Sequence, residues 1–356
     1  MTKKAAALLL SSLLILNISA CGLKKASRYE AQFLMLFDTL TTIVGYSNSE
    51  AEFTEHSQLI YDSLKEYHQL YDIYNEYEGI NNLKTINDNA GLAPVRVDRR
   101  IIDLIRFSLD WYEKTDGRVN IAFGAVLEIW HDYRTEGTEN PDEARLPPLE
   151  QLREAAEHTD ISKIIINDEE STVFLEDPDM SLDVGAVAKG YAVEQVSRIA
   201  MENGFTSGLI SVGGNVRAIS GKDEIGNKNS SDIVEPWNVA VQNPDLASEQ
   251  AQLHVMNLVD ASLVTSGVYE RFYIVDNKRY HHIIDTRTLY PSEYYSSVTI
   301  ICRDSGMADA LSTAVFNMPF EQGIEFVNGL DGVEALWVQN DGDVKYSDGF
   351  RALIME

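Results

Sequence analysis

Two early stretches of the chain show the spacing of apolar residues that is typical of an amphipathic helix. In residues 51–70, Phe53, Ile60 and Leu64 recur at helical intervals among charged residues. A second helix is predicted to begin after Asp98, a good N-cap residue, and to end at Gly117. The same criteria predict further helices at 185–203, 305–317 and 320–328.

The other apolar segments are short and bounded by turn residues, which favours strands. A strand or hairpin arm is expected at 33–46, and a last hairpin at 333–346 around Asn340-Asp341-Gly342. The remaining strands are expected at 163–167, 171–175, 208–212, 237–243, 252–258, 263–266, 280–284 and 295–302. Because the strands are largely adjacent, we expect an α+β fold with mixed, mostly antiparallel sheets and outer helices.

The N-terminus has the organisation of an export signal. Lys3 and Lys4 precede the apolar residues 5–16, and Ile18-Ser19-Ala20 leads to Cys21. This pattern resembles a lipobox, which predicts a lipoprotein signal peptide over 1–20 and acylation of Cys21. An ordinary secretory signal with a chance cysteine is the alternative. We expect a tether over 21–30, one domain over 31–356, and a lipid-anchored protein on the extracytoplasmic face of the cell membrane.

Composition and charge exclude some kinds of partner. The chain has 29 basic and 56 acidic residues and a formal net charge of −27. Nucleic acid is therefore not expected as a ligand, because phosphate binding needs clustered Lys and Arg.

With Cys21 acylated, Cys302 is the only thiol, and its apolar surroundings predict a core residue. The polar, acidic residues 131–160 are expected to form a surface insertion with a short helix.

Three short segments carry possible chemistry. The first, Asp183–Tyr191, has two glycines and Lys189 at a predicted helix start, where an anion would bind; a solvated lysine on a glycine-lined turn fits equally well. In the second, strand alternation puts His282, Ile284 and Thr286 on one face. His282 is either a proton acceptor that titrates near neutrality or part of a surface pair.

The third segment is a predicted helix with an acidic residue and a hydroxyl one turn apart. Asp309 and Thr313 are separated by four positions and therefore share one face. Their oxygens suit Mg²⁺, which combines few protein ligands with phosphate oxygens and water. Taken alone, the two residues fit as well a helix-start acid and a threonine bonded to its own backbone.

Taken in order, these segments resemble the motifs of the FAD:protein FMN transferases, the ApbE-type flavin transferases. Five residues depart from the family pattern: Asn120 and Ala122 replace an acid and a hydroxyl, Thr286 replaces a proline, Leu289 replaces a glycine, and Phe37 stands where the family often has methionine. The matching segments are Phe37-Asp38-Thr39, Tyr77 with Leu83–Asn87, Gly117–Trp130, Asp183–Tyr191, Gly213-Gly214-Asn215, Thr265–Arg271, His282–Thr288 and Ala308–Ala314.

The resemblance implies an ApbE-like fold with FAD in a cleft, and an enzyme that transfers FMN from FAD to a threonine of an exported protein. Ala186, Asp309 and Thr313 would ligate Mg²⁺, and His282 would assist the attack. The acceptor would carry a threonine motif similar to D-G-x-(S/T)-G-A-T. Residues implied to bind FAD are Phe37, Tyr77, Ala122, Phe123, Gly124, Asp183, Lys189, Thr265, Ser266, Ile284 and Asp285.

Three other functions stay open at this point. If water attacked in place of threonine, the protein would be an FAD pyrophosphatase giving FMN and AMP. Without turnover it would be an FAD-binding lipoprotein. A substrate-binding lipoprotein of a transporter would instead need two α/β lobes of comparable size.

Overall fold

The computed structural model describes residues 26–222 and 234–355, and its centre is an antiparallel sheet of eight strands. Residues 1–25, with the predicted signal peptide and Cys21, lie outside the described residues, as does most of the polar loop after Lys222. The strand order is β1-β2-β6-β7-β10-β13-β14-β15. The strands are β1 (Ser27–Leu36), β2 (Thr39–Ser47), β6 (Gly208–Val212), β7 (Asn215–Ile219), β10 (Ser262–Gly267), β13 (Tyr295–Cys302), β14 (Glu334–Gln339) and β15 (Val344–Tyr346).

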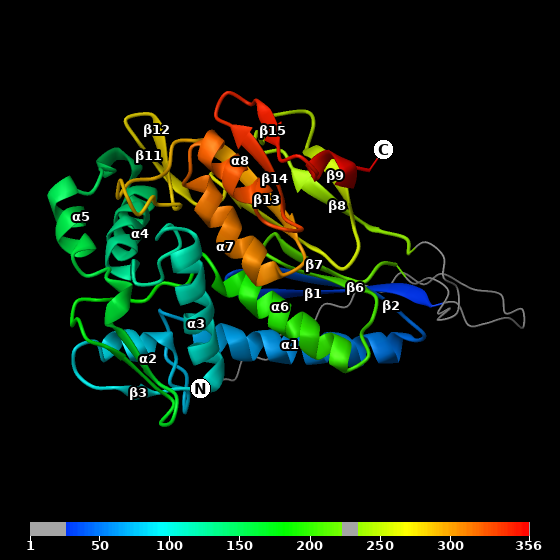
Figure 1. The fold of residues 1–356 in the computed structure, drawn as a ribbon, viewed down its shortest axis with the longest axis horizontal. Coiled ribbons are helices and arrows are strands. Elements are labelled where there is room, and N and C mark those ends of the chain that lie inside the picture. Colours follow the sequence, from blue (N-terminus) through cyan, green and yellow to red (C-terminus); the bar gives the residue numbers. More distant parts are fainter. Residues whose placement is uncertain (1–25, 223–233, 356) are drawn as a thin grey trace, which may run out of the picture.

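Four helices cover one face of this sheet, with α6 and α7 packed side by side across it (Figure 1). They are α1 (Glu50–Tyr71), α6 (Ala188–Glu202), α7 (Ser305–Phe316) and α8 (Phe320–Asn328). Ile60, Leu64 and Leu311 are fully buried under this layer, as their helical spacing predicts. The other face is covered by the hairpin of β8 (Trp237–Gln242) and β9 (Gln252–Leu258) and by the last turn, η3 (Phe350–Leu353).

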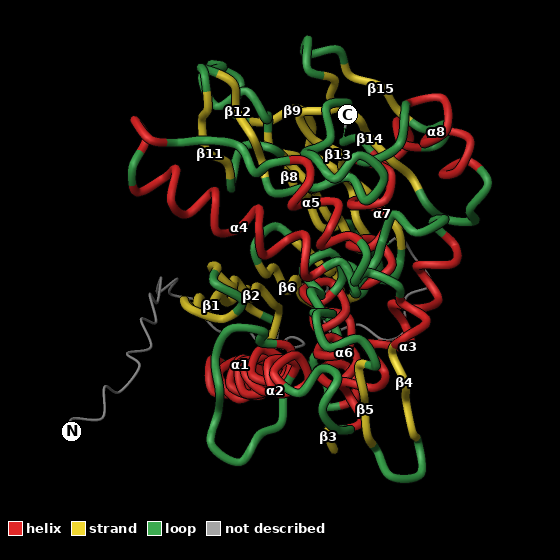
Figure 2. The backbone as a smooth tube through the Cα atoms, turned by 90° about the vertical axis from the view of Figure 1, so that its left-hand side faces the viewer, coloured by secondary structure: helices red, strands yellow, loops and turns green. Residues whose placement is uncertain are grey.

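The remaining elements form a more helical region at one end of the sheet. Figure 2 shows the β11–β12 hairpin beside one end of α4, and α4 packs against β11. Trp130, at 2% exposure, belongs to the apolar cluster of this region. Its elements are α2 (Leu83–Asp88), α3 (Arg99–Lys114), α4 (Gly124–Glu139), η1 (Pro141–Glu143), α5 (Leu149–Ala156), η2 (Ile161–Lys163), β3 (Val95–Arg96), β4 (Ile164–Asn167), β5 (Thr172–Leu175), β11 (Phe272–Val275) and β12 (Lys278–His281).

Most predicted elements are present, but several boundaries differ. Strand β1 begins at Ser27, inside the expected tether. Helix α4 begins at Gly124 and continues into the expected insertion, because Val126 and Trp130 lie on one face and pack into the core. Helix α6 begins at Ala188 and not at residue 185, since residues 184–187 form a turn.

Three strands were missed and one side chain was predicted correctly. Strands β3, β7 and β11 were not expected; Pro94 directly precedes β3, and Gly213-Gly214 precedes β7. Cys302 is buried at the end of β13, where burial raises the pKa of its thiol to about 12.

Within the described residues, we find no helix that is both long enough and apolar enough to cross a membrane.

Candidate functional site

A cavity of about 960 Å³ lies where the sheet, its helical layer and the α4 region meet. Its wall takes residues from distant parts of the chain, such as Phe37 at the β1–β2 turn, Arg134 on α4, Thr265 on β10 and Asp309 on α7. This volume is in the upper part of the range, about 300–1,000 Å³, that holds small molecules and cofactors. The cavity is the candidate site.

A buried carboxylate forms one corner of the cavity. Asp309 is 5% exposed, and its Oδ2 accepts a hydrogen bond of 2.8 Å from the N–H of Gly190 in the first turn of α6. Thr313, one turn later on α7, and Ala186, in the turn before α6, line the same cavity. Asp309, Thr313 and Ala186 thus lie where α6 begins, at the positive end of its helix dipole.

Gly190 is the residue that allows α6 and α7 to approach this closely. A Cβ at this position would lie 2.3 Å from the carbonyl oxygen of Ser305 and 2.4 Å from Cβ of Asp309. No side chain fits at those distances without moving the backbone of α7. The hydrogen bond that orients Asp309 therefore depends on a glycine at position 190.

Burial governs the electrostatics of two of the acids that line the cavity. It raises the pKa of Asp309, while the positive charge of Lys189 and the N–H of Gly190 oppose the rise. It also raises the pKa of Asp183, whose Oδ1 accepts a hydrogen bond of 2.8 Å from the N–H of Gly185. Buried carboxylates of this kind favour a bound cation, because a cation offsets the cost of desolvating their charge.

His282 follows directly after β12 and lines the cavity. Its backbone N–H and its Nδ1 both lie 3.2 Å from the carbonyl oxygen of Arg271. Because a carbonyl only accepts, Nδ1 carries the hydrogen, and Nε2 keeps its lone pair.

Burial, and next the charge of Arg271, lower the pKa of His282 to about 3. The prediction that His282 titrates near neutrality is therefore wrong. Burial keeps the imidazole neutral at ordinary pH. In this structure it is a neutral proton acceptor and not a group that titrates near pH 7.

The turn between β1 and β2 is strained at the edge of the cavity. Phe37 and Asp38 have positive φ angles of 51° and 53°, and Met35, at a bulge in β1, has 82°. Such angles are uncommon for residues other than glycine and cluster at functional sites. The N–H of Phe37 donates to Nδ1 of His68 at 3.3 Å, which holds the turn against α1.

Comparison with known proteins now decides the family. The model of the ApbE family matches residues 37–337. The FAD:protein FMN transferase of Treponema pallidum is 34% identical over 75% of this chain and 73% of its own length, and that of Klebsiella pneumoniae 30% over 84% and 85%. The chain belongs to the ApbE family.

Solved structures of the ApbE family share the fold. The crystal structure of the ApbE protein from Thermotoga maritima superimposes with a TM-score of 0.78 at 30% identity, covering 93% of this chain and 100% of its own. The flavin transferase ApbE from Vibrio cholerae gives 0.73 at 21% identity, covering 92% and 99%. The α+β, ApbE-like fold predicted from the sequence is confirmed.

The structure brings nearly all the residues suggested by the ApbE resemblance to one cavity. Strand β12 ends at His281, so the strand alternation predicted for His282, Ile284 and Thr286 is wrong: all three line the cavity, but Ile283 between them lines it too. The other predicted residues on its wall are Phe37, Phe123, Gly124, Asp183, Ala186, Lys189, Thr265, Ser266, Asp309 and Thr313.

Three of the suggested residues do not line the cavity. Tyr77 donates a hydrogen bond of 2.7 Å to Oδ2 of Asp72, and Asp72 lines the cavity in its place. Ala122 is fully buried, and its neighbours Phe123 and Gly124 face the cavity instead. Asp285 is 5% exposed, and its Oδ1 accepts the N–H of Arg287 within a turn.

Several residues that line the cavity were missed by sequence reasoning. His131 and Arg134 lie one turn apart on α4 and face the cavity, as does Tyr74, whose ring lies 5.6 Å from that of His131. Helical periodicity continued past Trp130 would have placed these α4 residues on one face. Tyr74 follows α1 in an irregular segment that gives no such signal.

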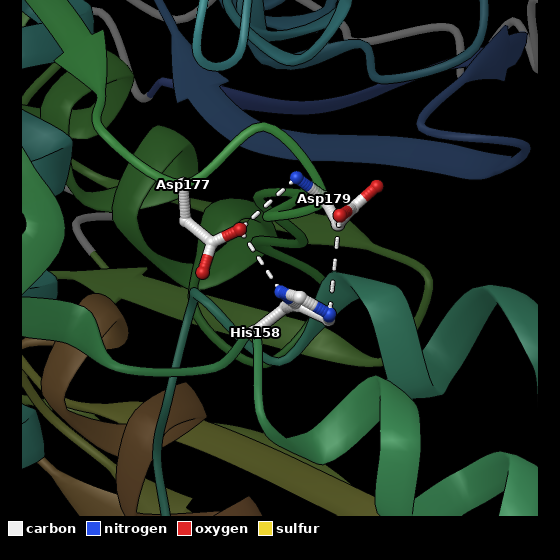
Figure 3. A group of neighbouring side chains, drawn as sticks. All are labelled: His158, Asp177 and Asp179. Atoms are coloured by element: carbon white, nitrogen blue, oxygen red, sulfur yellow. Dashed lines mark hydrogen bonds and ion pairs between the residues drawn. The ribbon is translucent and has the colours of Figure 1, made fainter.

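A second group of possible metal ligands lies where Asp179 reaches the cavity edge. Nδ1 of His158 lies 2.9 Å from Oδ1 of Asp177, and Nε2 lies 4.0 Å from Oδ2 of Asp179 (Figure 3). Nζ of Lys163 lies 2.7 Å from the other oxygen of Asp177. Its hydrogen bond is the main cause that lowers the pKa of Asp177 to about 2. Since Lys163 already supplies a cation, we assign this group a structural role.

Proposed function

We propose that this protein transfers FMN from FAD to a threonine hydroxyl of an exported target protein and releases AMP. The observation that carries the proposal is the meeting of two kinds of group in one cavity. Asp309, Thr313 and Lys189 come from the α6–α7 corner, and the neutral imidazole of His282 comes from the end of β12. The names of the curated relatives, which are FAD:protein FMN transferases, support this assignment.

The donor atoms at the α6–α7 corner fit Mg²⁺. A buried carboxylate at Asp309, the hydroxyl of Thr313 and the carbonyl of Ala186 are all hard oxygen ligands. Three protein ligands leave positions for phosphate oxygens. When bound there, Mg²⁺ would neutralise charge on the pyrophosphate.

The residues of the chain have separate tasks in this reaction. Lys189 and the N-terminal end of α6 attract the pyrophosphate. The threonine oxygen attacks the phosphorus of the FMN half, and the bond from that phosphorus to the oxygen of AMP breaks. AMP leaves with the electron pair, and Nε2 of His282 takes the threonine proton.

The test uses the protein from residue 22 onward, incubated with FAD, Mg²⁺ and an acceptor domain that carries the threonine motif. We expect in-gel flavin fluorescence and the mass increment of FMN on the acceptor, both lost with EDTA. Asp309→Asn should lower the transfer rate at least about 100-fold, because it removes the buried charge that holds the metal. Asp179→Asn, at the exposed edge of the His158 group, is the matched control and should keep full activity.

Other outcomes would support the other functions. Release of FMN and AMP without labelling of any acceptor would identify an FAD pyrophosphatase. Bound FAD without turnover would identify a flavin carrier. The transporter function is disfavoured, because the described residues form one central sheet and not two hinged lobes.

We also propose that Cys21 is acylated and anchors the domain to the extracytoplasmic face of the membrane. The support is the signal and lipobox pattern in the first 21 residues. A membrane fraction that contains the full-length chain, and a Cys21→Ala variant that is not acylated by mass spectrometry, would support it. An unmodified Cys21 in the mature protein would contradict it.

A further inference from the structure

Two arginines at the cavity have no partner in the part of the chain that the structure describes. Arg134, on α4, is half-buried, and Arg271, just before β11, is exposed; both line the cavity. Neither guanidinium makes an ion pair or hydrogen bond among the described residues. Glu128 and Glu270 also line the cavity but do not pair with them.

The fold holds these two cations near each other. Gly137 packs directly on the ring of Tyr273, where a Cβ would lie 2.6 Å from Cδ2, and the Tyr273 hydroxyl donates to the carbonyl of Arg145 at 3.1 Å. These contacts fix α4 against β11, so that Arg134 and Arg271 lie within electrostatic reach of each other. Burial, and next the charge of Arg271, lower the pKa of Arg134.

The lack of partners is unusual in a chain with a net charge of −27. Most arginines of the described residues are neutralised by carboxylates. Those paired with carboxylates include Arg99, Arg100, Arg106, Arg198, Arg217, Arg287 and Arg303. A half-buried guanidinium without such a partner costs free energy unless a ligand supplies the negative charge. The charge of Asp183 acts on Arg134 across the cavity, but Oδ1 of Asp183 accepts a hydrogen bond from the N–H of Gly185 and not from a guanidinium.

The position of the pair indicates which reactant supplies that charge. The carbonyl of Arg271 holds Nδ1 of His282, so the pair lies beside the proposed base. In an in-line displacement the attacking oxygen and the leaving oxygen lie on opposite sides of the phosphorus. Groups beside the base therefore face the approaching threonine and not the departing AMP.

We propose that Arg134 and Arg271 bind a carboxylate side chain of the acceptor protein close to its threonine. The proposal rests on the proposed transferase function and names the chemistry of its partner. Each arginine presents several N–H donors in the plane of its guanidinium group, and this arrangement matches the two oxygens of a carboxylate. Because Arg271 is at the surface, the acceptor segment reaches it from outside while FAD occupies the deeper cavity. The arginines are thus specificity-determining residues.

The test compares acceptor peptides that carry one Asp at successive positions before the threonine with matched Asn peptides. One Asp position should lower KM for the wild type about tenfold relative to its Asn peptide. Arg134→Gln and Arg271→Gln should remove this preference, with FAD affinity and the rate of FAD hydrolysis unchanged. Arg153→Gln, on the exposed face of α5, is the matched control and should keep the preference. A Lys peptide should regain activity with Arg271→Glu.

The opposite results are equally clear. A loss of FAD affinity in both glutamine variants would overturn the proposal and assign the pair to an FAD phosphate. Equal KM values for all Asp and Asn peptides would also overturn it. If the wild type transfers FMN to no peptide, the proposed function fails separately. Fluorescence anisotropy of the Asp peptides on the FAD-loaded protein then decides: binding lost in the variants supports the proposal, and no binding contradicts it.

Discussion

At the residue scale, the site depends on what burial does to charged side chains. Asp309 and His282 line one cavity, and desolvation disfavours the charged form of each. The two consequences differ. A buried carboxylate is stabilised by a cation beside it, whereas a buried imidazole stays neutral and keeps a lone pair on Nε2.

The first prediction concerns the pH dependence of His282. Its pKa is lowered from 6.5 to about 3, so the neutral form that accepts a proton persists as the pH falls well below 6.5. We expect its imidazole resonances, assigned with a His282→Gln variant, to stay unchanged between pH 8 and pH 5 in NMR spectra of the free protein. Titration of these resonances near pH 6.5 would show that the imidazole is solvated, and the assigned role would be wrong.

The second prediction concerns the ion pairs of Asp177. The pKa of this acid is about 2 in the fold and 3.8 as its ordinary value, so its charged form stabilises the fold above pH 3.8. Asp177→Asn should lower the free energy of unfolding by about 1 kcal/mol at pH 6. The difference should shrink as the pH falls from about 4 to 2. Urea unfolding at several pH values measures it.

Asp179→Asn is the control for this experiment, because Asp179 is 72% exposed and only 4.0 Å from His158. It should change the free energy of unfolding by less than about 0.5 kcal/mol. A difference for Asp177→Asn that stays constant down to pH 2 would exclude an electrostatic origin.

At the element scale, the pairing of α6 with α7 builds the corner of the cavity that holds Asp309. Glu194 of α6 is 4% exposed; it accepts hydrogen bonds from Arg217 of β7 at 3.1 Å and from the N–H of Ser305 at 3.0 Å. Nearer the start of α6, Gly190 holds Asp309. The two helices are thus joined at both places, which fixes the position of the carboxylate in the cavity.

The third prediction follows from this packing. Gly190→Ala should destabilise the protein by about 1–3 kcal/mol, because the new methyl group overlaps Ser305 and Asp309. It should also weaken Mg²⁺-dependent FAD binding, measured by quenching of flavin fluorescence. Gly323→Ala on α8 is the matched control, since its Cβ would meet nothing closer than 3.6 Å. An unchanged melting temperature and FAD affinity in Gly190→Ala would contradict the assigned contact.

At the scale of the whole molecule, charge is unevenly distributed. The net charge of −27 is far from neutral, yet the cavity holds Lys189, Arg134 and Arg271. An acidic surface keeps a protein soluble and repels anionic partners. The basic groups in the cavity are a local region of positive charge, which attracts anionic ligands.

The fourth prediction tests the acidic surface. Self-repulsion destabilises the folded state, and salt screens it over a distance of about 10 Å at 0.1 M. Raising NaCl from 0.05 to 0.5 M should therefore raise the melting temperature by a few degrees. Calorimetry measures it on the chain from residue 22 onward. A melting temperature that falls with salt would show that local ion pairs outweigh the repulsion.

Local signals in the sequence by themselves determined much of the site. The spacing of Asp309 and Thr313 placed both on one helical face, and both line the cavity. The order of short motifs indicated the ApbE family. These features depend on the fixed geometry of one helix or strand, so a single sequence contains them.

Only the tertiary structure decided which of these groups meet and how burial changes them. The low pKa of His282, the pairing of Arg134 with Arg271 and the turn of Tyr77 toward Asp72 all arise from contacts between distant segments. Helix α4 is a further example: its residues line the cavity because the helix packs against β11, and the sequence does not specify that contact. Desolvation and charge depend on every neighbour in space, and spacing along the chain does not specify those neighbours.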